Sequence, residues 1–235
     1  MRKILVLPLG LLMLVGVLFQ AQQISAVLYR ANLAWSPTSF LAGPAAPNSP
    51  AQTRSAGSEP FEFMQTYTVP GGNAPVRWPS CTSLTLLVET IGMPATGAAD
   101  VQSAAQQLAQ ATGLKVEVAM TGLVPLVNPD GVIPIRWKSS DSNFCNSGDA
   151  VACTQIHYAP MRSKPITRII DAEVVLYTDH AGPYLRRTLL HELGHAVGLN
   201  HVTSQNEIMF ERVTDVNNYR LGDLAGLHIA GQGAC

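Results

Sequence analysis

The sequence has little charge, and the two signs almost balance. Of its 235 residues, 15 are Lys or Arg and 16 are Asp or Glu, which gives a formal net charge of -1. A protein that binds the phosphate backbone of nucleic acid carries a marked excess of basic residues. The composition therefore excludes a nucleic-acid partner and is typical of an ordinary globular protein.

The sequence also lacks a long, uninterrupted apolar run. Behind Arg2 and Lys3, the apolar stretch Ile4–Phe19 contains one proline and two glycines. It is short for a membrane-spanning helix, which needs about 20 apolar residues, and slightly long for a signal peptide, whose apolar part has about 7–15. Ile24-Ser25-Ala26 offers a cleavage site. Residues 1–28 are therefore predicted to be a signal peptide, which we favour, or a membrane anchor, and either places the rest outside the cytoplasm.

Cysteine is scarce, and none of the four cysteines lies in a C-x-x-C pair. This absence argues against a cysteine-based metal site. An even number behind a targeting segment favours disulfides, and four cysteines allow three pairings. The closeness of Cys145 and Cys153 favours a local bond, which leaves Cys81 to pair with Cys235.

Residues 29–74 show no sustained apolar periodicity. Pro, Ala, Ser, Gly and Thr dominate much of this stretch, and such a composition buries too little apolar area to offset the entropy of ordering. We predict a linker or a short pro-segment. Phe61–Tyr67 is aromatic enough to pack onto the next domain or to lie across its cleft, although a solvated tether is the favoured interpretation.

Residues 75–235 have the length of one compact domain. Short apolar or alternating runs predict strands, and apolar residues at helical spacing predict helices. The order of strand, helix, several strands and helix indicates an α+β (mixed α/β) fold, and the sequence contains no internal repeat. The predicted strands are Leu84–Val88, Lys115–Met120, Ile133–Trp137, Gln155–Tyr158 and Ile166–Tyr177, and the predicted helices are Asp100–Thr112 and Leu185–Val197.

Against this background, one run of eleven residues concentrates three histidines and a glutamate: His191-Glu-Leu-Gly-His195-Ala-Val-Gly198-Leu-Asn-His201. Residues four apart share one face of a helix, so His191 and His195 can bind the same metal ion. Gly198 can end the helix because glycine adopts positive φ at little cost, and the chain can then bring His201 up as third ligand. Three imidazoles leave the fourth tetrahedral position of zinc open, as in catalytic sites.

Glu192 stands beside the first of these ligands and can reach a water bound to the metal. The chemistry that this arrangement predicts is hydrolysis. Zinc lowers the pKa of its water and polarises a carbonyl, while Glu192 takes the proton from the water as general base and passes it to the leaving amine. A structural zinc site has no use for such a carboxylate, so the pattern favours a catalytic zinc.

The eleven residues resemble, without a mismatch, the long zinc signature of the metzincin metallopeptidases. That family also has a methionine-containing turn beneath the metal, and Met209 within Glu207–Phe210 is the candidate for it. The chain most resembles a matrixin-type catalytic domain, because the loop from His201 to Met209 is short and Leu221–Leu227 is similar to the final helix of that group. The resemblance implies a twisted mixed sheet, an active-site helix, a Met-turn and a C-terminal helix.

The chain departs from that pattern in several places. The proline-arginine-cysteine-glycine switch of many matrixins is absent, so we do not expect Cys81 to cap the zinc. The ligands of the vertebrate structural zinc and calcium sites cannot be matched. We therefore expect one catalytic zinc and leave calcium open. The tyrosine that some metzincins place two residues after the methionine is replaced by Glu211.

The resemblance implies a secreted or membrane-tethered zinc endopeptidase. Its peptide substrate would lie along the edge strand at Gln155–Ala159, and Phe210–Val213 are candidates for the wall of the specificity pocket. Two alternatives are a zinc-binding scaffold without catalysis, which the intact Glu192 argues against, and a zinc amide hydrolase that acts on cell-wall peptides. The sequence makes no prediction of oligomeric state.

Overall fold

The computed structural model describes residues 61–142, 144, 145, 150–161 and 166–235. The predicted signal peptide or membrane anchor, and the predicted linker up to residue 60, lie outside these residues. Within the described part of the chain, no helix has the length and apolar character needed to cross a membrane. The assignment of residues 1–28 therefore stays a prediction.

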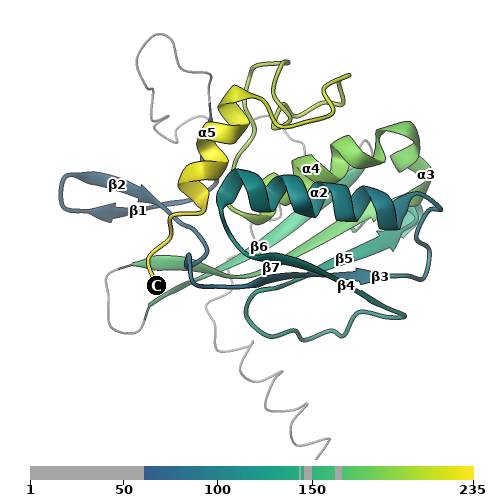
Figure 1. Ribbon diagram of the computed structural model, residues 1–235, viewed down its shortest axis with the longest axis horizontal. Helices are drawn as coiled ribbons and strands as arrows, with labels where there is room; N and C mark the ends of the chain where they lie inside the picture. Colours follow the sequence, from purple (N-terminus) through teal and green to yellow (C-terminus); the bar gives the residue numbers. More distant parts are fainter. Residues whose placement is uncertain (1–60, 143, 146–149, 162–165) are drawn as a thin grey trace, which may run out of the picture. The chain divides into compact units, whose positions relative to one another are not determined.

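A five-stranded mixed sheet, in the order β4-β3-β5-β7-β6, forms the centre of the described domain (Figure 1). Strands β3, β4, β5 and β7 run parallel, and β6 pairs antiparallel with β7 at one edge. This arrangement confirms the mixed α/β fold class. The strands are β3 (Leu84–Glu89), β4 (Val116–Thr121), β5 (Val132–Lys138), β6 (Ala152–Pro160) and β7 (Thr167–Tyr177).

Two helices, α2 (Gly97–Thr112) and α4 (Leu185–Ala196), lie side by side over the sheet, and α5 (Leu221–Ala230) packs against α2 (Figure 1). Helix α2 buries its apolar stripe of valine, alanine and leucine side chains in the core and ends at Gly113, which has a φ of 73°. The predicted helices and strands are confirmed, with ends that differ by a few residues. The short connecting elements before α4 are η1 (Ser140–Ser142), α3 (Thr178–Ala181) and η2 (Gly182–Tyr184).

The segment from residue 61 to 75 belongs to the folded domain. Its strands β1 (Thr66–Val69) and β2 (Gly72–Pro75) form an antiparallel hairpin. Phe63 forms a β-bridge with Leu199, and the Met64 N–H donates to the Gly198 carbonyl at 2.9 Å. The interpretation of this stretch as a solvated tether is therefore wrong, since Met64 is part of the hydrophobic core.

Both predicted disulfides are present. Cys145 pairs with Cys153, and Cys81 pairs with Cys235, each with a Cα–Cα distance of 5.8 Å. The second bond joins the segment before β3 to the C-terminal residue, 154 positions away. Cys81 is therefore a structural cysteine, as its place beside a strand and the missing switch motif predicted.

We expect a chain that starts at residue 76 to be less stable than one that starts at residue 61. The shorter chain loses the buried Met64 side chain and the backbone pairing with Gly198 and Leu199, which together contribute on the order of 3 kcal/mol. Calorimetry should show a Tm lower by roughly 5–10 °C. Equal Tm values would mean that this segment adds nothing to the fold.

Candidate metal centre

Three histidine rings converge on one point. His191 and His195 lie one turn apart on α4, and His201 comes from the loop that follows the helix. Their Nε2 atoms lie 3.1–3.2 Å from one another. The structure thus brings the three predicted ligands together, and among the described residues no other group of His, Cys, Asp or Glu side chains could hold a metal ion.

The proton positions on these rings follow from their other nitrogens. His191 Nδ1 lies 2.7 Å from the Ile208 carbonyl, and His195 Nδ1 lies 2.8 Å from the Leu199 carbonyl. A carbonyl only accepts, so each Nδ1 carries the proton and each Nε2 keeps its lone pair. Burial holds the pKa of His191 well below its usual value and lowers the pKa of His195 to about 3, so both rings stay neutral.

These ring nitrogens fit a zinc ion. Lone pairs that point at one another repel unless a cation lies between them. Zinc binds imidazole nitrogens at about 2.0–2.1 Å, which in a tetrahedral arrangement places the nitrogens about 3.3–3.4 Å apart. The observed spacing of 3.1–3.2 Å is close to that value. His191, His195 and His201 therefore form a three-histidine donor set of the catalytic kind, with one position left open.

The reversal of the chain after α4 depends on Gly198. Its φ is 104°, and a Cβ atom there would lie 3.0 Å from the Val76 carbonyl oxygen. Only glycine adopts this conformation without strain. The Trp78 indole donates to the Ala196 carbonyl at 2.8 Å and so satisfies one acceptor at the end of the helix. The predicted role of Gly198 in turning His201 toward the other ligands agrees with this geometry.

Met209 packs directly against α4 beneath the histidines. Its side chain is buried in the core, and a Cβ atom at Gly194 would collide with its sulfur. A side chain at Gly194 would therefore force the Met209 side chain to shift, and the sequence analysis did not recognise this contact. The predicted supporting role of Met209 is consistent with this packing.

Asp223 on α5 holds the turn in place. This buried carboxylate accepts the Ile208 N–H at 2.7 Å and the Met209 N–H at 3.1 Å. The Ile208 carbonyl, which accepts the His191 Nδ1–H, belongs to the same peptide group as the Met209 N–H, so one peptide group links Asp223 to a metal ligand. Sequence reasoning missed this residue, although one acid within the apolar run Leu221–Leu227 was a signal.

Arg187 is a second residue that sequence reasoning missed. It lies one turn before His191, and only 3% of its surface is exposed. Its guanidinium donates to the Phe210 carbonyl at 3.0 Å and also to the Arg212 carbonyl. A buried guanidinium bonded in this way ties the segment after Met209 to the zinc helix.

The Glu192 carboxyl group is buried beside His191. Burial raises its pKa to about 7, and a hydrogen bond from Thr154 and the charge of Arg187 act in the opposite direction. The Thr154 hydroxyl donates to Glu192 Oε2 at 2.7 Å. A carboxyl group that titrates near neutral pH suits a general base.

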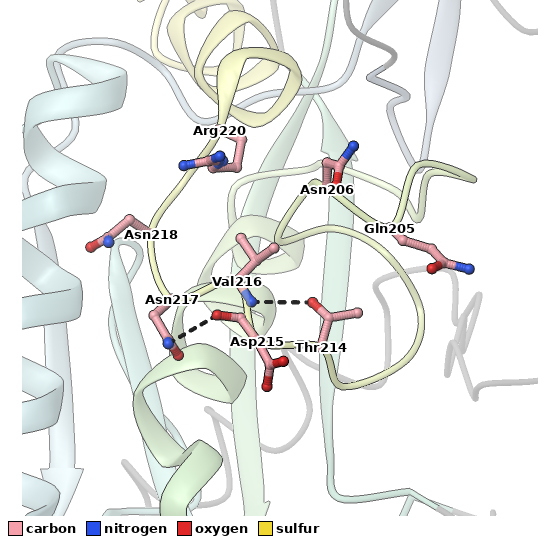
Figure 2. Close-up of a pocket in the computed structure, with 8 residues that line it drawn as sticks. All are labelled: Gln205, Asn206, Thr214, Asp215, Val216, Asn217, Asn218 and Arg220. Atoms are coloured by element: carbon pink, nitrogen blue, oxygen red, sulfur yellow. Dashed lines mark hydrogen bonds between the residues drawn. The ribbon is translucent and has the colours of Figure 1, made fainter.

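A cavity of about 510 Å³ lies between the loops on either side of Met209 (Figure 2). Seven of its eight lining residues have amide, hydroxyl or charged side chains. Phe210–Val213, the candidates for the wall of the specificity pocket, do not line this cavity, and their role in substrate specificity stays a prediction. The lining residues are Gln205, Asn206, Thr214, Asp215, Val216, Asn217, Asn218 and Arg220.

The comparison with known families gives one result. A family model described as Matrixin matches residues 88–227, which is more than half of the 235 residues. The matched region contains the three histidines, Glu192 and Met209. A search of curated proteins found no match.

We expect His201→Ala to lower the zinc content from about one ion per chain to well below half of that. Two imidazoles cannot complete the donor set that three provide. Elemental analysis by mass spectrometry after dialysis measures the bound metal. His157→Ala is the control, because that ring pairs with Asp171 at 3.1 Å, away from the three histidines. Full zinc occupancy in His201→Ala would contradict the assignment.

We expect Asp223→Asn to destabilise the protein by about 1–3 kcal/mol, because an amide offers one accepting oxygen where both carboxylate oxygens now accept N–H groups. Urea denaturation of the zinc-loaded protein measures the loss. Asp215→Asn, at an exposed loop position, serves as the matched control and should stay within about 0.5 kcal/mol of the parent. The same small change in both variants would show that Asp223 does not anchor the turn.

Proposed function

Since the chain belongs to the matrixin family of zinc metallopeptidases, which act on peptides or proteins, we propose that it is an exported endopeptidase with Glu192 as its general base. The observation that carries this proposal is the buried Glu192 carboxyl group next to three imidazoles whose Nε2 atoms converge. A donor set for a catalytic zinc and a base beside it are the two parts that metal-assisted peptide hydrolysis requires.

In the proposed hydrolysis, the three histidines bind the metal and Glu192 transfers the proton. His191, His195 and His201 would hold the zinc through Nε2. When bound, zinc polarises the scissile carbonyl and lowers the pKa of water. Glu192 accepts the proton of the attacking water at a carboxylate oxygen and delivers it to the leaving amine nitrogen. Burial of this carboxyl group keeps bulk water away from the proton transfer.

The edge strand β6 offers a binding surface for the substrate. Among the described strands it pairs only with β7, so its outer edge has backbone donors and acceptors for an extended peptide. The predicted segment Gln155–Ala159 lies within this strand of nine residues. A peptide that pairs along such an edge can continue past the cleaved bond in both directions, which supports an endopeptidase.

Export from the cytoplasm is supported by two features of the chain. The N-terminal residues 1–28 have the pattern of a signal peptide or membrane anchor. Both disulfides belong to the folded domain, and disulfides persist mainly in oxidising compartments. Sequencing the N-terminus of protein recovered from the medium and from the membrane distinguishes a cleaved leader from a retained anchor.

Substrate class is tested by incubating the purified protein with casein and with peptidoglycan, each with and without a metal chelator. We expect casein to be cleaved at internal bonds and the chelator to abolish this activity, because catalysis needs the bound metal. Release of soluble fragments from peptidoglycan alone would make the protein a cell-wall amide hydrolase. No cleavage of either substrate would favour the non-catalytic scaffold.

We expect Glu192→Gln to lose about 10²–10⁴-fold in kcat, which is the typical contribution of a general base. Zinc content and Tm should stay at the parent values, since Glu192 is not one of the clustered donor groups. Glu117→Gln, at an exposed position of β4, is the control and should keep full activity. Near-normal turnover of Glu192→Gln would show that another group moves the proton.

A further inference from the structure

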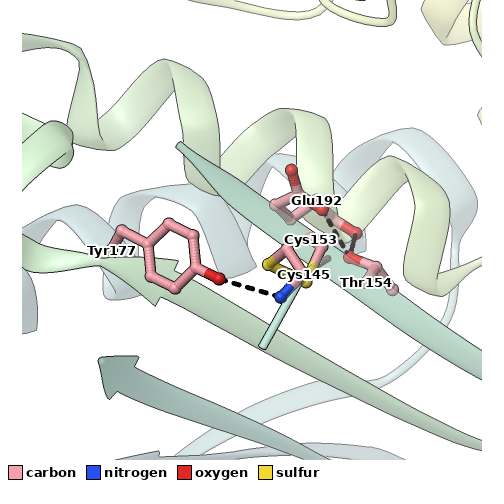
Figure 3. The surroundings of a disulfide bond; sticks show 5 residues. All are labelled: Cys145, Cys153, Thr154, Tyr177 and Glu192. Atoms are coloured by element: carbon pink, nitrogen blue, oxygen red, sulfur yellow. Dashed lines mark hydrogen bonds between the residues drawn. A yellow bond between two sulfur atoms is a disulfide. The ribbon is translucent and has the colours of Figure 1, made fainter. Parts of the chain in front are cut away.

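The hydroxyl of Thr154 is the one described group that donates a hydrogen bond to the catalytic carboxylate. Its Oγ1 lies 2.7 Å from Glu192 Oε2 and 3.0 Å from the Glu192 carbonyl oxygen (Figure 3). A hydroxyl has a single proton. The shorter contact and the charge of the carboxylate favour donation to Oε2.

This bond distinguishes the two oxygens of the carboxylate. With Oε2 held by Thr154, the other oxygen, Oε1, is left for the reacting proton. A glutamate side chain has three rotatable bonds, and its terminal torsion is broad when nothing restrains it. The Thr154 hydroxyl, which lies 2.7 Å from Oε2, restricts this terminal torsion to one orientation of the carboxylate. The carboxylate is then oriented before a substrate arrives.

Thr154 is itself held firmly. It lies on β6 opposite Val174 of β7, and only 2% of its surface is exposed. Its neighbour Cys153 is bonded to Cys145, and the Cys145 N–H donates to the Tyr177 hydroxyl at 2.8 Å (Figure 3). A β-branched side chain in a strand also has few χ1 choices. The Thr154 hydroxyl therefore has a fixed position from which it donates to the Glu192 carboxylate.

The chemical identity of the residue supports the same conclusion. Valine has the same shape as threonine and would fill this buried position without a polar group to satisfy. Both acceptors within reach of the Thr154 hydroxyl belong to Glu192. The hydroxyl therefore serves Glu192 alone, by satisfying its buried carboxylate and by fixing the orientation of that group.

We propose that Thr154 is a positioning residue that orients the Glu192 carboxylate for proton transfer, an inference that rests on the proposed peptidase function. Thr154→Val should lower kcat about 10–100-fold, because small displacements of a catalytic group cost factors of this size. The KM should change less than about two-fold and the zinc content should not change, since neither ligands nor the substrate edge is altered. Thr154→Ser, which keeps the hydroxyl, should recover kcat to within about three-fold of the parent.

The control for the loss of a buried hydroxyl is Thr112→Val on α2, far along the chain from the zinc helix. Thr112 Oγ1 donates to the Leu108 carbonyl at 2.7 Å and accepts the Leu114 N–H at 3.1 Å, so this variant removes a buried hydroxyl with two hydrogen bonds. It should leave kcat and KM unchanged. Parent-level kcat in Thr154→Val would overturn the proposal. Equal losses of kcat and zinc in both the valine and serine variants of Thr154 would overturn it too, because the residue would then act on the fold.

A second readout does not depend on activity. Crystal structures of the zinc-loaded parent and Thr154→Val should show one Glu192 orientation in the parent and a displaced or multiple orientation in the variant. An unchanged carboxylate in the variant would overturn the proposal. If the parent cleaves no peptide, the proposed function fails by itself, while these structures still decide whether Thr154 orients Glu192.

Discussion

The structure depends on holding three imidazoles with their Nε2 atoms directed at one point. Such an arrangement is repulsive unless a cation is present, so the fold has to supply the forces that keep the rings in place. Two of the rings donate Nδ1–H to backbone carbonyls of Ile208 and Leu199, which fixes both their tautomers and their orientation. These carbonyls belong to the chain after α4, and the geometry of the donor set therefore depends on how that segment is anchored.

The anchoring comes from elements that are distant in the sequence. Asp223 of α5 accepts the N–H groups of the turn that carries Met209, and Arg187 of α4 binds carbonyls just beyond it. Both side chains are buried, and an unpaired charge in the interior would cost several kcal/mol. Each charge is stable only while the turn keeps its conformation, so the interactions that satisfy these charges also hold the ligand set.

The carboxylate proposed as general base lies where the zinc helix meets the edge strand. Helix α4 supplies Glu192, and β6 supplies Thr154, which bonds to it. Among the described strands, β6 pairs only with β7, and its other edge is the one proposed for an extended substrate. The proposed substrate edge and the residue that bonds to Glu192 thus lie on one strand, which the disulfide between Cys145 and Cys153 fastens near its start.

The sequence by itself determined the donor set, because the spacing of His191 and His195 is a local property of one helix, and Gly198 is required by one backbone conformation. The mixed α/β class and the disulfide pairs followed from periodicity and spacing in the same way. Only the tertiary structure decided the roles of Thr154 and Asp223, since their partners lie on other elements and depend on how those elements pack. The composition of residues 61–75 did not predict that this segment is folded, for the same physical reason. Phe63 forms a β-bridge with Leu199 and Met64 is buried in the core, and neither contact can be read from the segment alone.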